Sequence, residues 1–564
     1  MAELFAAMSH FAKSIMENKN YVHEKPDNTR ESWPEASERV SRFVMDRYLP
    51  ELRPKVQQMI CNRQFMPGGR YLYSAGRRYS QLQNCMLWRA DDSREGWAEL
   101  LHDTASCLMT GGGVGVDYSP LRPQEYIIKG MGGKSTGPIS LARIINEGAR
   151  YIIQGGSRRS ALWAGLLWSH PDIFHFIHCK DQPKDLREYK AQNFNFPVPM
   201  EGTNISVILD DDFFAAYHTP GWSKTYSRWG TTYQVDHAWA HRVYWESVRS
   251  MLETAEPGLS IDVGPNAGQS LRNACTEATS ADNGDVCNLG SLNMARFSSL
   301  GEFAAAVRYG TAFLLCGTLA SEVPVQKMLA VREKNRRVGL GLMGVHEWLL
   351  LRGYRYEPNR ELARWVEAYL ESTAWGAEFA RKLGVNNPIA TRSIAPTGTI
   401  SIVAETTSGI EPIFATAIKR RYLEGTTWKH QYYIDPAAKR LIEQHKVSPE
   451  QIEDAYTLAE DVGRRISFQA WLQGYVDQGI SSTINMPAWG TANNNEHTVK
   501  TFGDTVMAHL PRLRGLTVYP DGARDGQPLT RVTYQEAHGK IGQVFDEELA
   551  VAAAGNCKGG VCNS

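Results

Sequence analysis

Short apolar runs of strand length alternate along this chain with longer amphipathic stretches of helical length. The apolar runs that predict strands lie at 84–88, 161–168, 204–209, 337–342 and 515–519. The stretches that predict helices lie at 37–48, 51–61, 94–109, 139–153 and 361–383. Asp92 and Ser93 can cap the helix that ends near Met109. From about residue 531 the pattern becomes irregular.

Two glycine-rich stretches interrupt this pattern. Residues 111–115 follow a helix, whereas a dinucleotide-binding fingerprint needs a strand before the glycines and a helix after them. We therefore interpret them as sites of close backbone packing or of sharp strand entry. Residues 154–160 carry Arg158 and Arg159 beside two glycines, which suits a mobile loop that touches an anion. A solvated basic turn is the equally open alternative.

The stretch 393–401 joins an apolar lead-in to a Pro-Thr-Gly turn with several hydroxyl side chains. Backbone N–H groups of such a turn, near a helix N-terminus, form a cradle for an anion. The Gly-Lys-Ser/Thr ending of a Walker loop is missing. A turn that merely caps a helix is the alternative interpretation.

Composition narrows the class of protein. The 564 residues are 42% apolar and 22% charged, with a formal net charge of zero. Length predicts three or four domains, and the neutral balance gives no indication of a nucleic-acid polymer or a membrane as partner. We find no signal peptide and no apolar stretch of about 18 residues. A soluble, cytoplasmic protein is expected.

Nine cysteines are too few, and odd in number, for a secreted disulfide scaffold. No Cys-x-x-Cys occurs, so no metal site is predicted. Cys557 and Cys562 lie among glycines near the C-terminal end, where a pair of thiols can take part in thiol–disulfide exchange.

Asn273, Cys275 and Glu277 form the central candidate site. In extended or looped backbone, alternate residues point the same way, so an amide, a thiol and a carboxylate can face one substrate. Cys287 places a second thiol close by in the sequence. The alternative is a cysteine that serves only as a small buried apolar residue.

Together these stretches resemble the large catalytic chain of ribonucleotide reductase. The resemblance runs from about residue 65 to the C-terminus, and four pieces carry it: Asn84-Cys85; Asn273-x-Cys275-x-Glu277 with Cys287–Ser291; Ala395–Ser401 continuing to Pro412; and the Cys557/Cys562 pair. It implies an α/β fold, a ten-stranded barrel of two five-stranded halves with a central finger loop that carries Cys275. The expected domains are a helical segment at 1–60, the barrel at 61–530 and a flexible redox tail at 531–564.

The resemblance also implies roles. Cys275 would carry a transient thiyl radical, Glu277 would act as general base, and Asn273 would hold the sugar. Cys85 and Cys287 would supply the reducing equivalents, and Cys557 and Cys562 would re-reduce them with a thioredoxin- or glutaredoxin-like donor. Substrate phosphates would bind at Thr397, Gly398, Thr399 and Ser401.

The source of the radical distinguishes three classes in this family. No glycyl-radical setting appears near the C-terminus, which argues against the anaerobic class. Tyr519 is followed by Pro520 rather than by a second tyrosine, which argues against the class that receives its radical from a separate small subunit. The run 394–414 resembles the adenosylcobalamin-dependent class, which we expect here. A large subunit that needs a separate metal-radical partner is the alternative, and a nucleotide-binding protein without turnover is the alternative outside enzymes.

Regulation follows from the same resemblance. The region before Cys85 is too short for an ATP-cone, so on/off control by ATP and dATP is not expected. Asp92, Lys134, Arg158 and Arg159 stand where the family binds a dNTP or ATP specificity effector. A homodimer is expected, since no large insertion lies between Cys85 and Gly155. The run 394–414 favours diphosphate substrates, whereas residues 67–70 look more like the triphosphate type.

Overall fold

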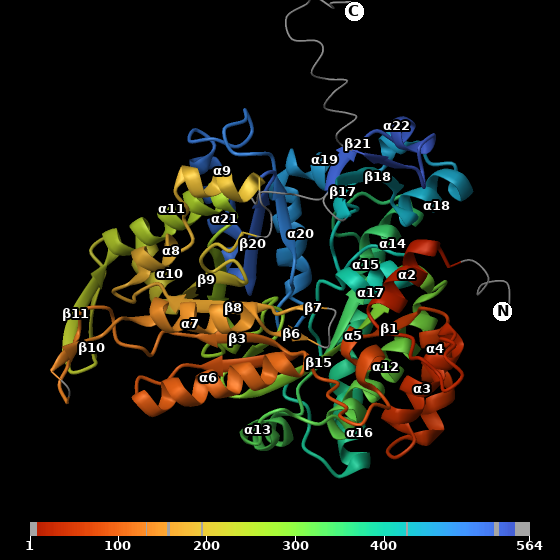
Figure 1. Ribbon diagram of the computed structural model, residues 1–564, viewed down its shortest axis with the longest axis horizontal. Coiled ribbons are helices and arrows are strands. Elements are labelled where there is room, and N and C mark those ends of the chain that lie inside the picture. The colour runs from red at the N-terminus through yellow and green to blue at the C-terminus, as the bar shows by residue number, and fades with distance from the viewer. Residues whose placement is uncertain are drawn as a thin grey trace, which may run out of the picture.

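Five apolar strands, all parallel, form the centre of the fold in the computed structural model (Figure 1). The structure describes residues 8–130, 132–154, 158–192, 196–424, 427–523 and 529–546. The five strands are β2 (Cys85–Arg89), β3 (Gly113–Asp117), β8 (Leu162–Leu167), β9 (Thr203–Asp210) and β12 (Gly258–Asp262). Helices connect most of them, as parallel pairing requires.

A second set of strands joins this sheet at both edges. β15 (Asp285–Asn293) runs parallel to β16 (Val338–Met343), and β19 (Thr483–Met486) runs parallel to β20 (Gly515–Pro520). β15 pairs antiparallel with β2, and β20 pairs antiparallel with β12. With β1 (Phe65–Pro67), which lies antiparallel to β15, these strands make one ten-stranded sheet.

Two single bridges lie between β16 and β19. Leu340 on β16 pairs with Arg392, and Ile394 pairs with Ile480, both in parallel orientation. The chain at 392–394 therefore lies between β16 and residue 480, which precedes β19.

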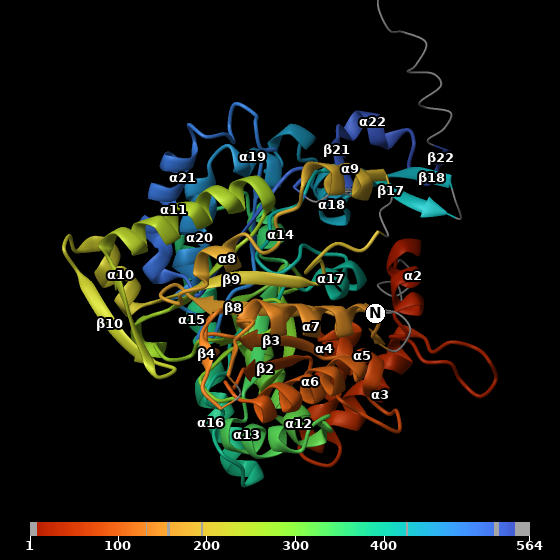
Figure 2. The ribbon, with the colours of Figure 1, turned by 60° about the vertical axis from the view of Figure 1, so that its left-hand side comes forward.

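Helices cover the outside of the sheet. α6 (Arg94–Met109) begins after Ser93, whose hydroxyl accepts a hydrogen bond from Gly96 N, as the sequence predicts. α7 (Pro138–Arg150) opens on a proline that suits a first helical turn. Figures 1 and 2 both show α6 and α7 beside β3 and β8, and Figure 2 shows β2 next to them.

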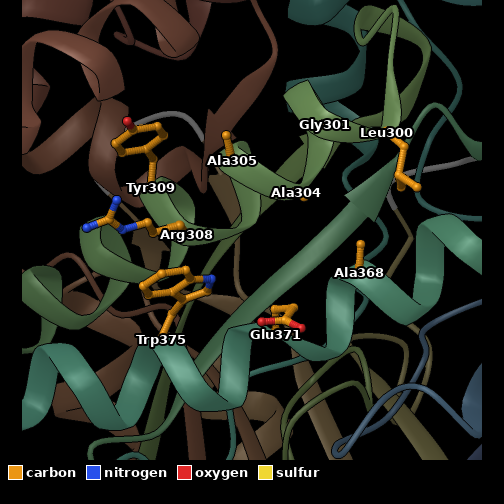
Figure 3. Close-up of a pocket in the computed structure, with 9 residues that line it drawn as sticks. All are labelled: Leu300, Gly301, Ala304, Ala305, Arg308, Tyr309, Ala368, Glu371 and Trp375. Carbon is orange, nitrogen blue, oxygen red and sulfur yellow. The ribbon is translucent and has the colours of Figure 1, made fainter.

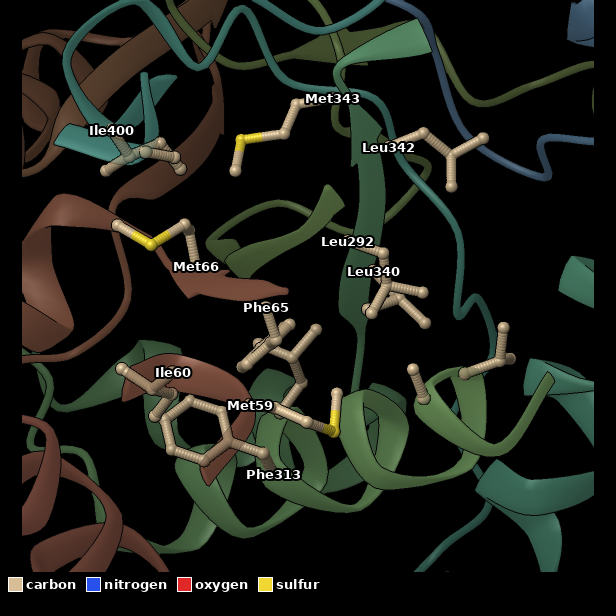
Figure 4. Close-up of a cluster of buried hydrophobic side chains, with 14 of the residues drawn as sticks. Met59, Ile60, Phe65, Met66, Leu292, Phe313, Leu340, Leu342, Met343 and Ile400 are labelled. Atoms are coloured by element: carbon tan, nitrogen blue, oxygen red, sulfur yellow. The ribbon is translucent and has the colours of Figure 1, made fainter. Parts of the chain in front are cut away.

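A separate core joins the N-terminal helices α3 (Trp33–Met45) and α4 (Arg53–Cys61) to the second set of strands. Figure 4 shows Phe65 and Met66 of β1, Leu340 of β16 and Phe313 of α12 (Leu300–Ala320) within one apolar cluster. α12 is long and apolar enough to span a membrane, so the expectation that no such stretch occurs was wrong. In the structure, 67% of its apolar window is buried inside the protein. Its composition is that of a core helix.

Three regions differ from the sequence prediction. The expected helix at 361–383 is two helices, α15 (Arg360–Leu370) and α16 (Ser372–Leu383), which separate at Glu371. A hairpin of β10 (Ser223–Arg228) and β11 (Thr231–Asp236) projects at the edge of the molecule, opposite the N-terminal helices (Figures 1 and 2).

The third difference lies near the C-terminal end. β21 (Leu529–Val532), α22 (Tyr534–His538) and β22 (Val544–Asp546) occupy the stretch where an irregular chain was expected. The two strands flank the hairpin of β17 (Ala417–Glu424) and β18 (Thr427–Ile434) in a four-stranded antiparallel sheet. Their pairing partners lie about a hundred residues away in the sequence, so no local pattern predicts these two strands.

Candidate active site

Cys275 stands at the tip of a hairpin that we call the finger loop, residues 271–280. β13 (Leu271–Arg272) and β14 (Thr279–Ser280) pair antiparallel at its base. The tip turns at Thr276, whose φ of 67° lies in the left-handed region, and Thr276 N donates to Asn273 O (3.0 Å). A left-handed turn in a non-glycine residue is uncommon and marks a constrained loop.

Residues of β3, of β20 and of the segment before β19 lie close to the finger loop. An added Cβ at Gly115 of β3 would lie 1.8 Å from the carbonyl oxygen of Arg272, and one at Gly479 would lie 2.7 Å from that of Thr276. A Cβ added at Gly515 of β20 would lie 3.5 Å from the hydroxyl oxygen of Thr276. The interpretation of residues 111–115 as close backbone packing is confirmed at Gly115.

The structure brings four of the predicted catalytic residues together. Cys85 opens β2 and Cys287 lies on β15, and the two are paired directly across the strands. Asn273 Nδ2 donates to Cys85 Sγ (3.0 Å), and the Cys85 thiol donates to Glu277 Oε1 (3.7 Å). The thiol of Cys85 therefore contacts both flanking residues of the Asn-x-Cys-x-Glu motif.

Burial governs the ionisation of the paired thiols. Cys85 and Cys287 are almost inaccessible to solvent. Burial raises the pKa of Cys85 well above its ordinary value, and the charges of Glu277, Cys287 and Cys275 raise it further. Burial also raises the pKa of Cys287. Both groups hold their protons at neutral pH, and none of the seven cysteines among the described residues forms a disulfide. Cys275, by contrast, is partly exposed.

Two contacts that sequence reasoning missed hold Glu277. Its carbonyl oxygen accepts hydrogen bonds from Ser393 Oγ (2.9 Å) and from Gly479 N (2.7 Å), while its side chain is 1% exposed. Asn273 is held too, because its Oδ1 accepts from Ala278 N (3.0 Å). Ser393 and Gly479 lie more than a hundred residues from the finger loop, and no local signal marks them.

The predicted phosphate cradle lies at the N-terminus of α17 (Gly398–Ala404). Thr397 precedes the helix with φ of 53°, and its hydroxyl accepts from Gly409 N (2.7 Å). No side chain caps the helix, and Gly398 is exposed, so the N–H groups of the first turn face outward. Ser401 Oγ lies 2.8 Å from Ser408 Oγ, while Thr399 is half-buried. The cradle starts beside the paired thiols, since Ala395 packs in one cluster with Cys85 and Cys287.

The predicted effector residues lie at both ends of the parallel strands, because Asp92 and Lys134 follow β2 and β3 whereas Arg158 and Arg159 precede β8. Asp92 accepts from Arg122 Nε (2.9 Å), and Lys134 pairs with Glu125 (2.6 Å) in the same loop after β3. Arg158 and Arg159 form β7, which pairs with β6 (Ile153–Gln154). The residues between these two strands, and Cys557 with Cys562, lie outside the described residues.

A hollow of about 580 Å³ between α12 and the α15–α16 pair contains none of these groups. Figure 3 shows Arg308 beside the ring of Trp375, with Ala304 and Ala305 on the same helix. Its lining offers neither a thiol nor a motif residue, so it is not the active site.

Comparison with known proteins decides the family. A family model described as the barrel domain of ribonucleotide reductase matches residues 83–385 and 376–519. The chain belongs to the ribonucleotide reductase family. Apart from β1 and the last residue of β20, the strands of the main sheet fall within the matched residues.

Curated members of this family are similar over most of the chain. A vitamin B12-dependent ribonucleoside-diphosphate reductase of Thermoplasma acidophilum is 28% identical over 85% of this chain and 66% of its own length. One of Mycobacterium tuberculosis is 26% identical over 93% of this chain and 81% of its own. A protein of Mycobacterium phage D29, named as an adenosylcobalamin-dependent ribonucleoside-triphosphate reductase, is 25% identical over 96% and 98%.

Proposed function

We propose that this chain reduces ribonucleotides to 2′-deoxyribonucleotides by thiyl-radical chemistry, with adenosylcobalamin as the source of the radical, and so supplies precursors of DNA. The observation that carries the proposal is the direct pairing of Cys85 with Cys287, beside Asn273 and Glu277. The names of the similar proteins agree with it.

The fold in this proposal is a closed ten-stranded barrel of two five-stranded halves around the finger loop. The parallel set from β2 to β12 would be one half. The other would consist of β15, β16, the segment 392–394, β19 and β20. Two antiparallel junctions and the bridges at Leu340 and Ile394 support closure. The contacts of the finger loop with β3 and β20 support its central position.

Features around Cys275 fit a bound cofactor. Its thiol is partly exposed, whereas Cys85 and Cys287 are buried. The neighbouring strand β20 carries Tyr519 followed by Pro520, so it lacks the tyrosine pair that long-range radical transfer from a partner subunit would use. When bound there, adenosylcobalamin would supply a carbon-centred radical, which would take the hydrogen atom of the Cys275 thiol and leave Cys275 as a thiyl.

The finger residues would then act on the ribose. The Cys275 thiyl removes the unactivated 3′-hydrogen and later returns it, so it is not consumed. Glu277 takes the proton of the 3′-hydroxyl as general base, and its backbone is fixed by Ser393 and Gly479. Asn273 hydrogen-bonds the sugar from the position that its bond to Ala278 N defines.

The paired thiols would supply two electrons and two protons. The 2′-hydroxyl leaves as water with one proton, the carbon gains hydrogen in its place, and Cys85 and Cys287 become a disulfide. Their raised pKa values keep both protons on sulfur until they are needed. Regeneration would come from Cys557 and Cys562 in a C-terminal redox tail (531–564), and then from a thioredoxin- or glutaredoxin-like donor.

Substrate phosphates would bind at Thr397, Gly398, Thr399 and Ser401, where a short helix presents backbone N–H groups. We favour the diphosphate as substrate, in keeping with the names of two of the similar proteins. Asp92, Lys134, Arg158 and Arg159 would form part of a specificity-effector site in a homodimer. The protein would act in the cytoplasm.

The test is reduction of CDP and of CTP by the purified chain under dithiothreitol, with and without adenosylcobalamin. We expect turnover only with the cofactor, and faster with CDP. Absence of turnover with cofactor across several effectors would overturn the cobalamin assignment. Turnover that appears only after addition of a metal-radical small subunit would establish the alternative class.

A further inference from the structure

A cavity of about 590 Å³ opens at the carboxyl ends of the five parallel strands. The last residue of each strand lines it: Arg89, Asp117, Leu167, Asp210 and Asp262. Cys85 is the first residue of β2, so the cavity and the paired thiols lie at opposite ends of that strand. Ligands of α/β proteins bind preferentially at carboxyl ends of parallel strands.

Three aspartates line the cavity, and one oxygen atom of Asp262 has no hydrogen-bond donor. Asp262 is 6% exposed, and its Oδ2 accepts from Gly268 N (3.2 Å). Its Oδ1 has no hydrogen-bond partner among the described residues. The other two carboxylates are occupied, Asp117 by Ser270 Oγ (2.8 Å) and Asp210 by Trp168 Nε1 (2.8 Å). The charges of Arg272 and Arg514 act on the Asp262 carboxylate and oppose the rise of its pKa that burial causes, but neither arginine donates a hydrogen bond to Oδ1. A buried acceptor without a donor is costly, so Oδ1 is available to a donor group.

The rim of the cavity is basic and aromatic. Trp229 stands at the end of the β10–β11 hairpin, stacks on Tyr233 with 5.8 Å between ring centroids, and donates from Nε1 to Pro120 O (2.7 Å). Arg228 beside it is half-buried, and the side chain of Arg89 is 35% exposed and 3.8 Å from Asp117. The cavity thus combines three aspartates, a flat wall and a basic rim.

A bare divalent cation does not fit this arrangement. Within the described residues, no group of three His, Cys, Asp or Glu side chains can hold a metal ion, so the three aspartates are too far apart to share one. A larger molecule is required, with a donor at one end and an acidic group at the other. A guanidinium suits Asp262 and the wall together, because it donates several hydrogen bonds and stacks on aromatic faces.

We propose that this cavity binds a small amphoteric organic molecule. Its guanidinium or ammonium group lies against Asp262 and along Trp229, and its acidic group reaches Arg89 and Arg228. The site is distinct from the thiol chemistry and does not depend on the proposed function. It adjoins the finger loop, however, because Gly268 and Ser270 precede β13 and bind Asp262 and Asp117.

Calorimetric titration of the full chain with L-arginine and with agmatine, which lacks the carboxylate, tests the site. We expect both to bind, L-arginine about tenfold more tightly because its carboxylate forms charge-assisted hydrogen bonds at the rim. D262N weakens both by about tenfold or more. The exposed neighbour variant D211N leaves both affinities unchanged.

R228A is the second variant, because Asp262 supports the finger loop and D262N can fail to fold. Arg228 is the last residue of β10, which pairs with β11 and is not a strand of the main sheet. R228A should bring the affinity for L-arginine down to that for agmatine. Absence of binding at millimolar concentration, equal affinities of both probes in wild type and R228A, or binding of Mg²⁺ alone that D262N abolishes would each overturn the proposal.

Discussion

Cys85 and Cys287 face each other directly across an antiparallel pair of strands. Directly opposed residues in such a pair have Cα atoms about 4.5 to 5.5 Å apart. A disulfide spans Cα separations of about 4.4 to 6.8 Å. The two thiols can therefore be oxidised to a disulfide and reduced again with little movement of β2 or β15.

The first prediction concerns this pair. After reaction with substrate and cofactor without an external reductant, peptide mapping should find Cys85 linked to Cys287, because their oxidation supplies the electrons in the proposed mechanism. A C557S/C562S double variant should retain the link after a single turnover and then stop. A linked peptide that contains Cys107 or Cys316 instead would contradict the assigned roles.

The second prediction concerns Cys275. C275A should abolish deoxyribonucleotide formation while the affinity for CDP, measured by calorimetry, stays within about twofold, because no other described thiol stands at the finger tip. C61A is the matched control, since Cys61 is also partly exposed but lies on α4. Measurable turnover by C275A would exclude it as the radical carrier.

The third prediction concerns the thiol of Cys85. Glu277 adds a negative charge that raises its pKa, after burial as the larger cause. E277Q should lower the pKa of Cys85, while burial keeps it above the ordinary value. Each unit by which the pKa falls increases the thiolate fraction about tenfold. Alkylation of Cys85 by iodoacetamide at pH 9, followed by mass spectrometry, measures this. An unchanged rate would show that the carboxylate does not act on the thiol.

The fourth prediction concerns the space around the finger loop. In G115A the new methyl group would meet the carbonyl oxygen of Arg272, which should lower the free energy of unfolding by about 1–3 kcal/mol and abolish turnover. G148A is the control, since Gly148 lies on α7 with nothing near its Cβ position. It should raise the free energy of unfolding by about 0.5–1 kcal/mol. Denaturant titration measures both.

The fifth prediction concerns acid stability. His346 is fully buried and accepts a hydrogen bond from Ile413 N (2.9 Å), and burial lowers its pKa from 6.5 to about 3. The unfolded chain therefore binds a proton that the folded chain does not, so stability is present above pH 6.5 and is lost as pH falls toward 3. Between pH 6.5 and 5 this amounts to about 2 kcal/mol. H346N should show a correspondingly smaller loss over that interval in denaturant titrations.

Local patterns predicted the central strands well. The apolar runs at 84–88, 161–168 and 204–209 became β2, β8 and β9 with ends shifted by one or two residues. The cap of α6 was also confirmed at Ser93. In each case the signal is contained within a few residues, because strand burial and helix capping are local properties.

Long-range relationships were beyond local patterns. Nothing near Cys85 in the sequence states that it will pair with Cys287, and the resemblance supplied that expectation. The contacts of Ser393 and Gly479 with Glu277, and the sheet formed by β17, β18, β21 and β22, had no such source. The separation of α15 from α16 at Glu371 was missed, since apolar residues continue with helical spacing through the break.

The position of the finger loop has a consequence for protein synthesis. Gly479 and Gly515, which lie close to the loop, are added to the chain some two hundred residues after Cys275. The nascent chain therefore contains the Cys275 thiol before the residues that surround the finger loop have been added. In the proposed mechanism, radical chemistry at Cys275 has to wait until these later residues are added. A translation product that stops before them carries the motif without the residues that surround the loop.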